Sequence, residues 1–331
     1  MADGSLRLMQ DAMRDPSFAI ARTLDIPDVP ALPDEDWGSY LRRIGFTEAQ
    51  MEYVRRGFSN AAGDSMQYTS AEEILEELAD KSDGTGDFRI LEGYSRLIEH
   101  QAQGLDIRLN TIVKHIDWSD EGVRVETDQG LFEADQVVIT LPVGVLQSGT
   151  IEFNPALPPE KQRAIANLRM GPVIKLVYRF EQPIVDKSIM LIFGAGNPPV
   201  WWSPSFGLET DQHVWTAFVS GDGARELLAL GETGALEKAL DSLRQELDCP
   251  DLKASDMRLI NWPADPFARG GYSVATPGHA DARRILALPM NGKVFWAGEG
   301  TTSGTSVGTV HGAYRSGKRA AAEILANNHQ K

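Results

Sequence analysis

The fold is decided by the stretch Val294-Phe-Trp-Ala-Gly-Glu-Gly-Thr-Thr-Ser-Gly-Thr-Ser-Val-Gly-Thr-Val-His-Gly-Ala-Tyr314. Its first four residues are apolar and predict a short buried strand of a parallel sheet. Residues 300–306 are only Gly, Thr and Ser, so they predict a loop that bends closely around a ligand. From about Gly308 the apolar residues recur at helical spacing, which predicts a helix that continues beyond Ala320.

Two features of this strand–loop–helix unit favour an anionic or hydroxyl-rich ligand. The helix start at Gly308 and Thr309 offers unpaired N–H groups and the positive end of the helix dipole. Glu299, at the end of the strand, can accept hydrogen bonds from sugar hydroxyls. The alternative is a tight turn in which the glycines serve packing and Glu299 points into solvent. The residue pattern alone leaves both interpretations open.

A longer match favours the ligand site. Phe295-Trp-Ala-Gly-Glu299 followed by Gly308-Thr-Val-His-Gly-Ala-Tyr314 resembles the C-terminal flavin motif of the FAD-dependent amine oxidases. The resemblance implies an α/β fold, in which part of an FAD-binding domain interleaves with a substrate domain of helices and an antiparallel sheet. It also implies FAD as the cofactor. The residues implied to bind it here are Gly298, Glu299 (ribityl chain), and Gly308, Thr309 and Val310 (flavin N1–C2=O edge).

The bulk properties exclude several classes of partner. The net charge of −15 argues against binding to nucleic acid or to an anionic membrane. One cysteine rules out an internal disulfide, and the six histidines lack the spacing of metal ligands, so no metal site is expected. We find neither a leader nor an apolar run of about 18 residues, and therefore expect a cytoplasmic protein without a membrane span.

The resemblance implies how the two domains alternate along the chain. Residues 1–90 are expected to form the helical part of the substrate domain and residues 91–150 a portion of the FAD domain. Residues 151–290 are expected to hold the antiparallel sheet of the substrate domain, and residues 291–331 the C-terminal unit of the FAD domain. In the helical part, the predicted N-caps are Asp36, Thr47 and Ser70, the last two with capping-box spacing.

The segment after residue 104 predicts strands. Leu105, Ile107 and Leu109 alternate as in a strand, residues 123–127 alternate again, and residues 137–141 form a continuous apolar strand. Together they predict a β-meander followed by a buried strand. The resemblance implies that the backbone of Val113 contacts the adenine end of FAD, whereas its position alone fits a core residue equally well.

Lys175 stands inside an apolar strand, which is uncommon for lysine. Such a lysine is either an edge residue that extends its amine to solvent or a buried residue with a functionally tuned pKa. By resemblance to polyamine-oxidase-like members, Lys175 would hold a water against flavin N5. Other members supply this lysine from the position that is Gln147 here.

Trp262-Pro-Ala-Asp-Pro-Phe-Ala-Arg-Gly-Gly-Tyr272 is a second match to the same family. The resemblance implies that Tyr272 stands beside the flavin as one wall of an aromatic cage and positions the amine. The opposite wall is a tyrosine in monoamine oxidases and Thr309 here, so we expect a wider or more polar pocket. Trp262 and Thr309 complete the predicted substrate pocket.

The resemblance implies oxidation of a small-molecule amine. A hydride would pass from the C–N carbon to FAD N5, the imine would hydrolyse, and O2 would reoxidise the flavin, with Lys175 and Tyr272 as the catalytic residues. The family's N-terminal Gly-x-Gly-x-x-Gly fingerprint is missing. We therefore expect the chain to be a fragment, a subunit whose partner chain supplies the Rossmann half, or a flavin-less remnant that acts as an interaction module. An L-amino-acid oxidase is a further alternative, with Arg269 as the candidate partner of the substrate carboxylate.

Overall fold

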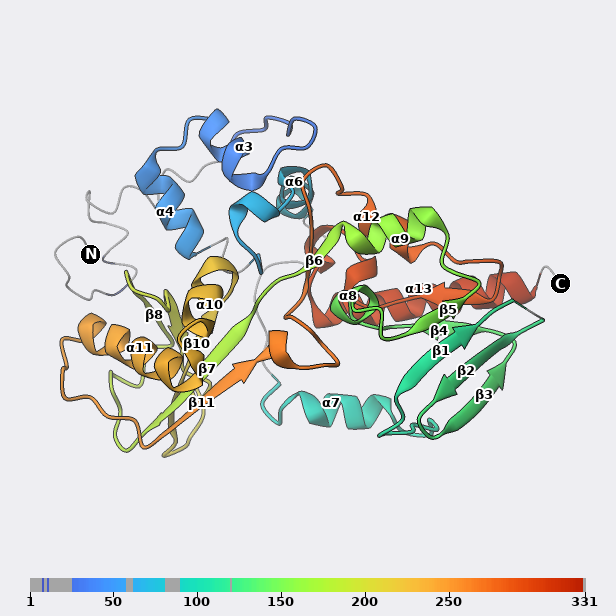
Figure 1. Ribbon diagram of the computed structural model, residues 1–331. Helices are drawn as coiled ribbons and strands as arrows, with labels where there is room; N and C mark the ends of the chain where they lie inside the picture. The colour runs from blue at the N-terminus through green and yellow to red at the C-terminus, as the bar shows by residue number, and fades with distance from the viewer. Residues whose placement is uncertain are drawn as a thin grey trace.

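The computed structural model describes Leu8, Asp11 and residues 26–57, 62–80, 90–119 and 121–329. Figure 1 shows two sheet-containing parts on opposite sides, with the N-terminal helices above them. Helices occur together with parallel and antiparallel sheets, which confirms the predicted α/β class. No described helix combines the length and apolar character that crossing a membrane requires.

One part is a five-stranded antiparallel sheet in the order β11-β7-β10-β9-β8. Its strands are β7 (Ile174–Phe180), β8 (Leu191–Phe193), β9 (Val200–Trp202), β10 (His213–Val219) and β11 (Asp256–Asn261). Helices α10 (Gly221–Leu228) and α11 (Gly231–Glu246) share a core with one face of this sheet. Because side chains alternate along a strand, the buried Ile174, Leu176 and Tyr178 face these helices, and Lys175 lies on the opposite face.

The other part begins with the predicted meander. Strands β1 (Val113–Asp117), β2 (Val123–Thr127) and β3 (Gly130–Ala134) are antiparallel neighbours, and β5 (Glu152–Asn154) adds to β1 in parallel. A core of apolar side chains joins these strands to α9 (Pro159–Ala166) and α12 (Ala282–Ala287). The short helix α8 (Val143–Gln147) contributes its buried first residues to the same core.

The strand–loop–helix unit of the C-terminus forms as predicted. Strand β13 (Val294–Trp296) pairs in parallel with β4 (Val137–Ile139). Two single 3₁₀ turns, η4 (Glu299–Thr301) and η5 (Gly304–Ser306), lead into the 19-residue helix α13 (Val310–Asn328). The glycine-rich loop therefore lies at the carboxyl end of a buried parallel strand, where ligands of α/β folds bind.

The N-terminal part contains α3 (Trp37–Arg43), α4 (Glu48–Arg56), η2 (Met66–Tyr68) and α6 (Ala71–Ala79). Asp36, Thr47 and Ser70 cap these helices as predicted, and Thr47 forms a complete capping box with Gln50. The box at Ser70 is only half formed. The side chain of Glu73 turns away from the helix start and bonds Arg283 and the Ala275 N–H instead.

The strand predicted from Leu105, Ile107 and Leu109 does not form. These three side chains are exposed by 66%, 55% and 79%, and the segment has no regular structure. The helix before it, α7 (Tyr94–Gln101), has no buried residue, and Figure 1 shows it apart from the main body. The prediction was wrong because a strand requires a hydrogen-bonding neighbour, and the described residues supply none at this position.

Two short strands connect the parts. Strand β6 (Leu168–Met170) pairs with β12 (Ser273–Ala275), and the residue before β12 is Tyr272. The Tyr272 carbonyl accepts a hydrogen bond from the Gly171 N–H at 3.0 Å. The backbone on both sides of Tyr272 is thus fixed in a small sheet at the centre of the molecule.

The two glycines Gly312 and Gly317 of α13 differ in their surroundings, which makes them a matched pair. A Cβ at Gly312 would lie 2.0 Å from the Ser306 carbonyl oxygen, whereas one at Gly317 would meet nothing within 4 Å. We expect Gly312→Ala to destabilise the chain by about 1–3 kcal/mol through overpacking. Gly317→Ala should stabilise it by up to about 1 kcal/mol. Urea unfolding measures both, and equal effects would contradict the tight packing of the loop against α13.

Lys161 provides a pH-dependent prediction. Its buried amine donates to the carbonyls of Ile285, Leu286 and Leu288 at the end of α12, and burial lowers its pKa to about 8. Between pH 8 and pH 10.5 the unfolded chain keeps a proton that the folded chain has released, so stability from this group rises with pH. We expect Lys161→Met to lack this rise. Parallel pH profiles of the unfolding free energy in parent and variant would contradict the assignment.

Candidate functional site

The backbone at the end of β13 is open to a ligand. Gly298 has φ +111°, a conformation that favours glycine, and a Cβ placed there would have only the Thr140 carbonyl oxygen nearby, at 3.7 Å. Its N–H donates to the Ser316 hydroxyl of α13 at 2.8 Å, which fixes the loop against the helix. An incoming group can therefore approach the Gly298 backbone closely.

The start of α13 is organised by Thr309. Its hydroxyl accepts from the Gly312 N–H at 3.0 Å and lies 2.9 Å from the Ser306 carbonyl, to which it donates. The Thr309 hydroxyl is thus used in capping the helix. The N–H of Val310, a residue with 54% of its surface exposed, has no partner within the described ranges. The positive end of the longest described helix is therefore accessible at Val310.

Glu299 lies behind this opening. Its carboxylate accepts from the Ser273 N–H at 3.2 Å and from the Ser273 hydroxyl at 2.9 Å. Arg283 approaches the same carboxylate to 3.8 Å. Because 22% of the Glu299 side chain is still exposed and a carboxylate has about four acceptor positions, it can accept further hydrogen bonds from a ligand.

Two glycine backbones lie against the Tyr272 ring. A Cβ at Gly63 would lie 2.4 Å from ring atom Cε2, and one at Gly308 would lie 2.9 Å from Cδ2. Burial raises the pKa of the Tyr272 hydroxyl, with the negative charges of Glu77 and Glu299 as smaller contributions. The hydroxyl is therefore protonated at neutral pH. The structure brings together the predicted residues Tyr272, Glu299 and Gly308, which are called the Tyr272 group below.

Lys175 lies on the open face of the five-stranded sheet. Its amine is 5.8 Å from the centroid of the Trp202 ring, and the paired residues on the neighbouring strands are Phe218 and Ile260. Burial lowers the pKa of Lys175. Trp262 begins the 3₁₀ turn η3 (Trp262–Ala264) directly after β11, and 38% of its surface is exposed.

Val113 lies elsewhere, in an open groove with a volume of about 760 Å³. The groove runs between the β1 end of the meander, α8 and the loop with Phe267 and Arg269, and Tyr272 is not among the residues that line it. Val113 and Arg269 therefore line the same groove, which Tyr272 does not reach.

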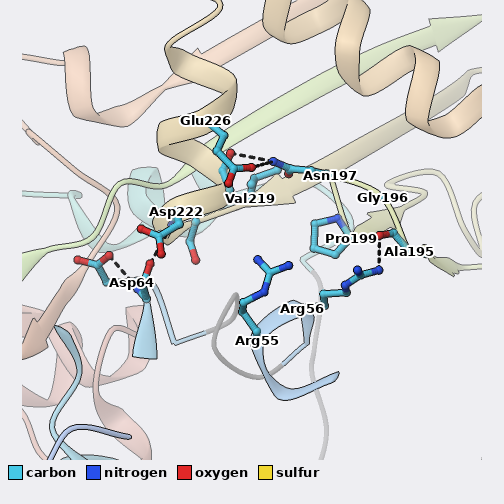
Figure 2. Close-up of a pocket in the computed structure, with 14 residues that line it drawn as sticks. Arg55, Arg56, Asp64, Ala195, Gly196, Asn197, Pro199, Val219, Asp222 and Glu226 are labelled. Carbon is cyan, nitrogen blue, oxygen red and sulfur yellow. Dashed lines mark hydrogen bonds between the residues drawn. The ribbon is translucent and has the colours of Figure 1, made fainter. Parts of the chain in front are cut away.

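A second, smaller cavity of about 160 Å³ lies between α4, the β8–β9 connection and the start of α10. Figure 2 shows Arg55 pointing into it from α4, across from Asp222 and Glu226. Asp64 and Ser65 also line the cavity, and the adjacent Gly63 contacts Tyr272. The backbone at residues 63–65 thus separates this cavity from the Tyr272 group.

Sequence reasoning missed three residues that shape the site, namely Gly63, Glu73 and Arg283. Arg283 is 2% exposed and donates hydrogen bonds to both the hydroxyl and the carbonyl of Ser273. Glu73 pairs with this guanidinium from α6. The only local signal was the capping-box spacing of Ser70 and Glu73, which indicates a helix start and gives no hint of a partner 210 positions away.

Comparison with known proteins identifies the family. The family model of flavin containing amine oxidoreductases matches residues 2–325. Lysine-specific histone demethylase 1B of Mus musculus is 30% identical over 315 residues, which are 88% of this chain and 37% of that protein. Polyamine oxidase 4 of Oryza sativa subsp. japonica is 34% identical over 239 residues, 71% of this chain and 48% of that protein.

The fold is also shared with solved structures. A putrescine oxidase variant with redesigned cofactor binding superposes with a TM-score of 0.79 at 20% sequence identity, covering 98% of this chain and 77% of that one. The chain thus spans less than half the length of these two curated relatives and about three quarters of the solved structure. Since the family model matches nearly the whole chain, this protein belongs to the flavin-containing amine oxidoreductases, a family whose cofactor is FAD.

Proposed function

We propose that this chain forms the substrate-binding and flavin-ring-binding part of an enzyme that oxidises amines. The observation that carries the proposal is the arrangement around Tyr272. An open strand end at Gly298, the start of α13 and a partly buried, protonated tyrosine belong to this arrangement. Bound FAD would supply the redox chemistry, accepting a hydride from the carbon that bears the amine and passing electrons to O2, while the imine hydrolyses.

The residues at this place fit a flavin. The Val310 N–H lacks a partner in the described parts of the chain and is a donor for an electron-rich ring edge. Glu299 keeps acceptor positions for the hydroxyls of a ribityl chain. The open backbone at Gly298 lets a large group approach. Together these groups match the parts of FAD nearest its ring, and the Val113 groove has room for the adenine end.

The side chains of the chain have distinct proposed roles. Tyr272 orients the amine, and the high pKa of its hydroxyl keeps it neutral, so it does not repel a developing negative charge. Lys175, whose pKa burial lowers, is proposed to hold a water near the reacting atoms. Trp262 and the methyl group of Thr309 are proposed to line the pocket, because the Thr309 hydroxyl is already used in capping α13.

We further propose that a dinucleotide-binding unit, from a further segment or a second chain, completes the enzyme. Helix α7 has no buried residue, and helices of eight residues are unstable in water without packing. The strand-patterned residues Leu105, Ile107 and Leu109 are exposed. Among the described residues, strands β13 and β4 form a sheet of only two parallel strands, whereas parallel sheets are normally larger and covered on both faces. All three features support a missing neighbour with parallel strands.

Two other functions are less well supported. A non-catalytic interaction module would use the same exposed apolar surface around α7, but it gives no reason for the open Gly298 backbone at the end of β13. An L-amino-acid oxidase requires a cation beside the substrate. Arg269 lines the Val113 groove, which does not include Tyr272, so it is poorly placed for that role. We therefore propose an aliphatic amine, such as a polyamine, as the substrate.

Titration of residues 1–331 with FAD tests the proposal through flavin fluorescence and visible absorbance. We expect quenching with a dissociation constant on the order of 100 μM, because only part of the cofactor is contacted. Glu299→Gln should weaken binding by about tenfold through loss of a charge-assisted hydrogen bond. The control Glu133→Gln changes a carboxylate that is 66% exposed on β3 and should have no effect. Unchanged spectra at about 1 mM FAD with a folded chain would favour the interaction module.

Lys175→Met tests the lysine in FAD-loaded protein. After anaerobic reduction by an aliphatic diamine, mixing with O2 should restore the flavin absorbance at least about tenfold more slowly in the variant, because the amine no longer holds the water. Lys238→Met, an exposed lysine on α11, serves as the control. Reoxidation as fast as in the parent would remove Lys175 from the reaction.

A further inference from the structure

Arg283 is an almost fully enclosed charged side chain near Tyr272. It lies on α12 with 2% of its surface exposed, and its guanidinium is directed at β12. Nη1 donates to the Ser273 hydroxyl at 2.7 Å, Nη2 to the Ser273 carbonyl at 2.6 Å, and Nε to Glu73. A buried guanidinium that donates two hydrogen bonds to the same residue holds that residue firmly in place.

Ser273 is held from the opposite side by Glu299. The Glu299 carboxylate accepts from the Ser273 N–H and hydroxyl, and the Glu299 carbonyl accepts from Arg283 at 3.4 Å. The N–H, carbonyl and hydroxyl of Ser273 are thus all bonded to two charged residues. Since Ser273 directly follows Tyr272, this clamp fixes the backbone from which the Tyr272 ring projects.

Glu73 anchors the clamp to the N-terminal helices. One of its oxygens pairs with Arg283, and the other accepts from the Ala275 N–H at 2.8 Å. Figure 1 shows α6, which carries Glu73, close to α12. The same helix also holds the loop before α13, because Asp80 accepts from the Thr305 N–H at 3.1 Å. Helix α6 thus fixes the strand of Tyr272 and the loop beside it together.

The cluster around Arg283 contains more negative than positive side chains. One guanidinium faces the carboxylates of Glu73 and Glu299, and Glu77 lies near enough for its pKa to be raised, first by its own burial and then by Glu73. Arg283 is therefore shared between two anions. Any change at Glu73 alters how closely the guanidinium can approach Glu299 and Ser273.

We propose that Arg283, anchored by Glu73, is a positioning residue that sets where the Tyr272 ring lies relative to Glu299. Its meaning for catalysis rests on the proposed function, since Tyr272 and Glu299 are the groups assigned there to the amine and the cofactor. The positional effect itself is a property of this chain and needs no cofactor. An ion pair that only supported the fold would leave the Tyr272 ring unmoved when replaced.

The proposal is tested by NMR of the full chain with ¹³C-labelled tyrosine rings. The protein has seven tyrosines, so the Tyr272 signal can be assigned with Tyr272→Phe. Buried ion pairs can often be replaced by neutral groups without loss of the fold. We therefore compare the parent with the double variant Glu73→Gln/Arg283→Met. We expect the Tyr272 signal to shift or broaden, while tyrosines far from the clamp, such as Tyr178 in the other core, keep their positions.

Matched variants separate positioning from general disturbance. Arg283→Lys keeps the charge and should leave the Tyr272 signal closer to its position in the parent. Arg283→Gln removes the charge and should shift the signal further. Lys161→Met removes an equally enclosed charge that also bonds α12 and should leave Tyr272 unchanged. Should a variant at Arg283 fail to fold, Glu73→Gln alone provides the same comparison, with a smaller shift of Tyr272.

The outcome is independent of flavin binding. A Tyr272 signal that coincides with that of the parent in the folded double variant would overturn the proposal, even if FAD binds. Equal shifts in Arg283→Lys and Arg283→Gln, or an equal shift in Lys161→Met, would also overturn it. A shift specific to the clamp in a chain that binds no FAD would support the positioning role while contradicting the proposed function.

Discussion

A buried positive charge must be compensated, and this requirement at Arg283 joins the separate parts of the molecule. The guanidinium bonds α6 through Glu73 and β12 through Ser273, and it approaches the loop after β13 at Glu299. None of these elements can move away without leaving a buried charge or a buried carbonyl unpaired. The Tyr272 group therefore has a fixed geometry even though Glu73 and Arg283, which hold it, lie 210 positions apart.

Much of the fold could be predicted because its local patterns agree with its tertiary contacts. The apolar run at residues 294–297 became the buried strand β13, and the helical spacing after Gly308 became α13. The alternation at Leu105, Ile107 and Leu109 was equally clear, yet it gave no strand. Alternation describes what a strand would bury, but the ladder of hydrogen bonds depends on a neighbour that a local pattern does not reveal.

The candidate site, too, could be predicted from the sequence only in part. Tyr272, Glu299 and Gly308 were found because each belongs to a long motif, and the structure places them together. Whether they act as proposed stays a prediction. Arg283 and Glu73 could not be found, because a pair 210 positions apart leaves no periodic signal in either helix. Glu73 even fits a different role locally, since its spacing from Ser70 is that of a capping box.

The enclosure of the Tyr272 ring has a consequence for biosynthesis. Gly63 touches one side of the ring, and Gly308, close to the C-terminus, touches it as well. During synthesis on the ribosome, the Tyr272 ring and the edge of β4 lack these contacts until β13 and α13 have been made. Nascent chains with such late, long-range contacts fold slowly and expose apolar surface until folding is complete. We therefore expect newly made chains to be prone to aggregation until α13 has left the ribosome.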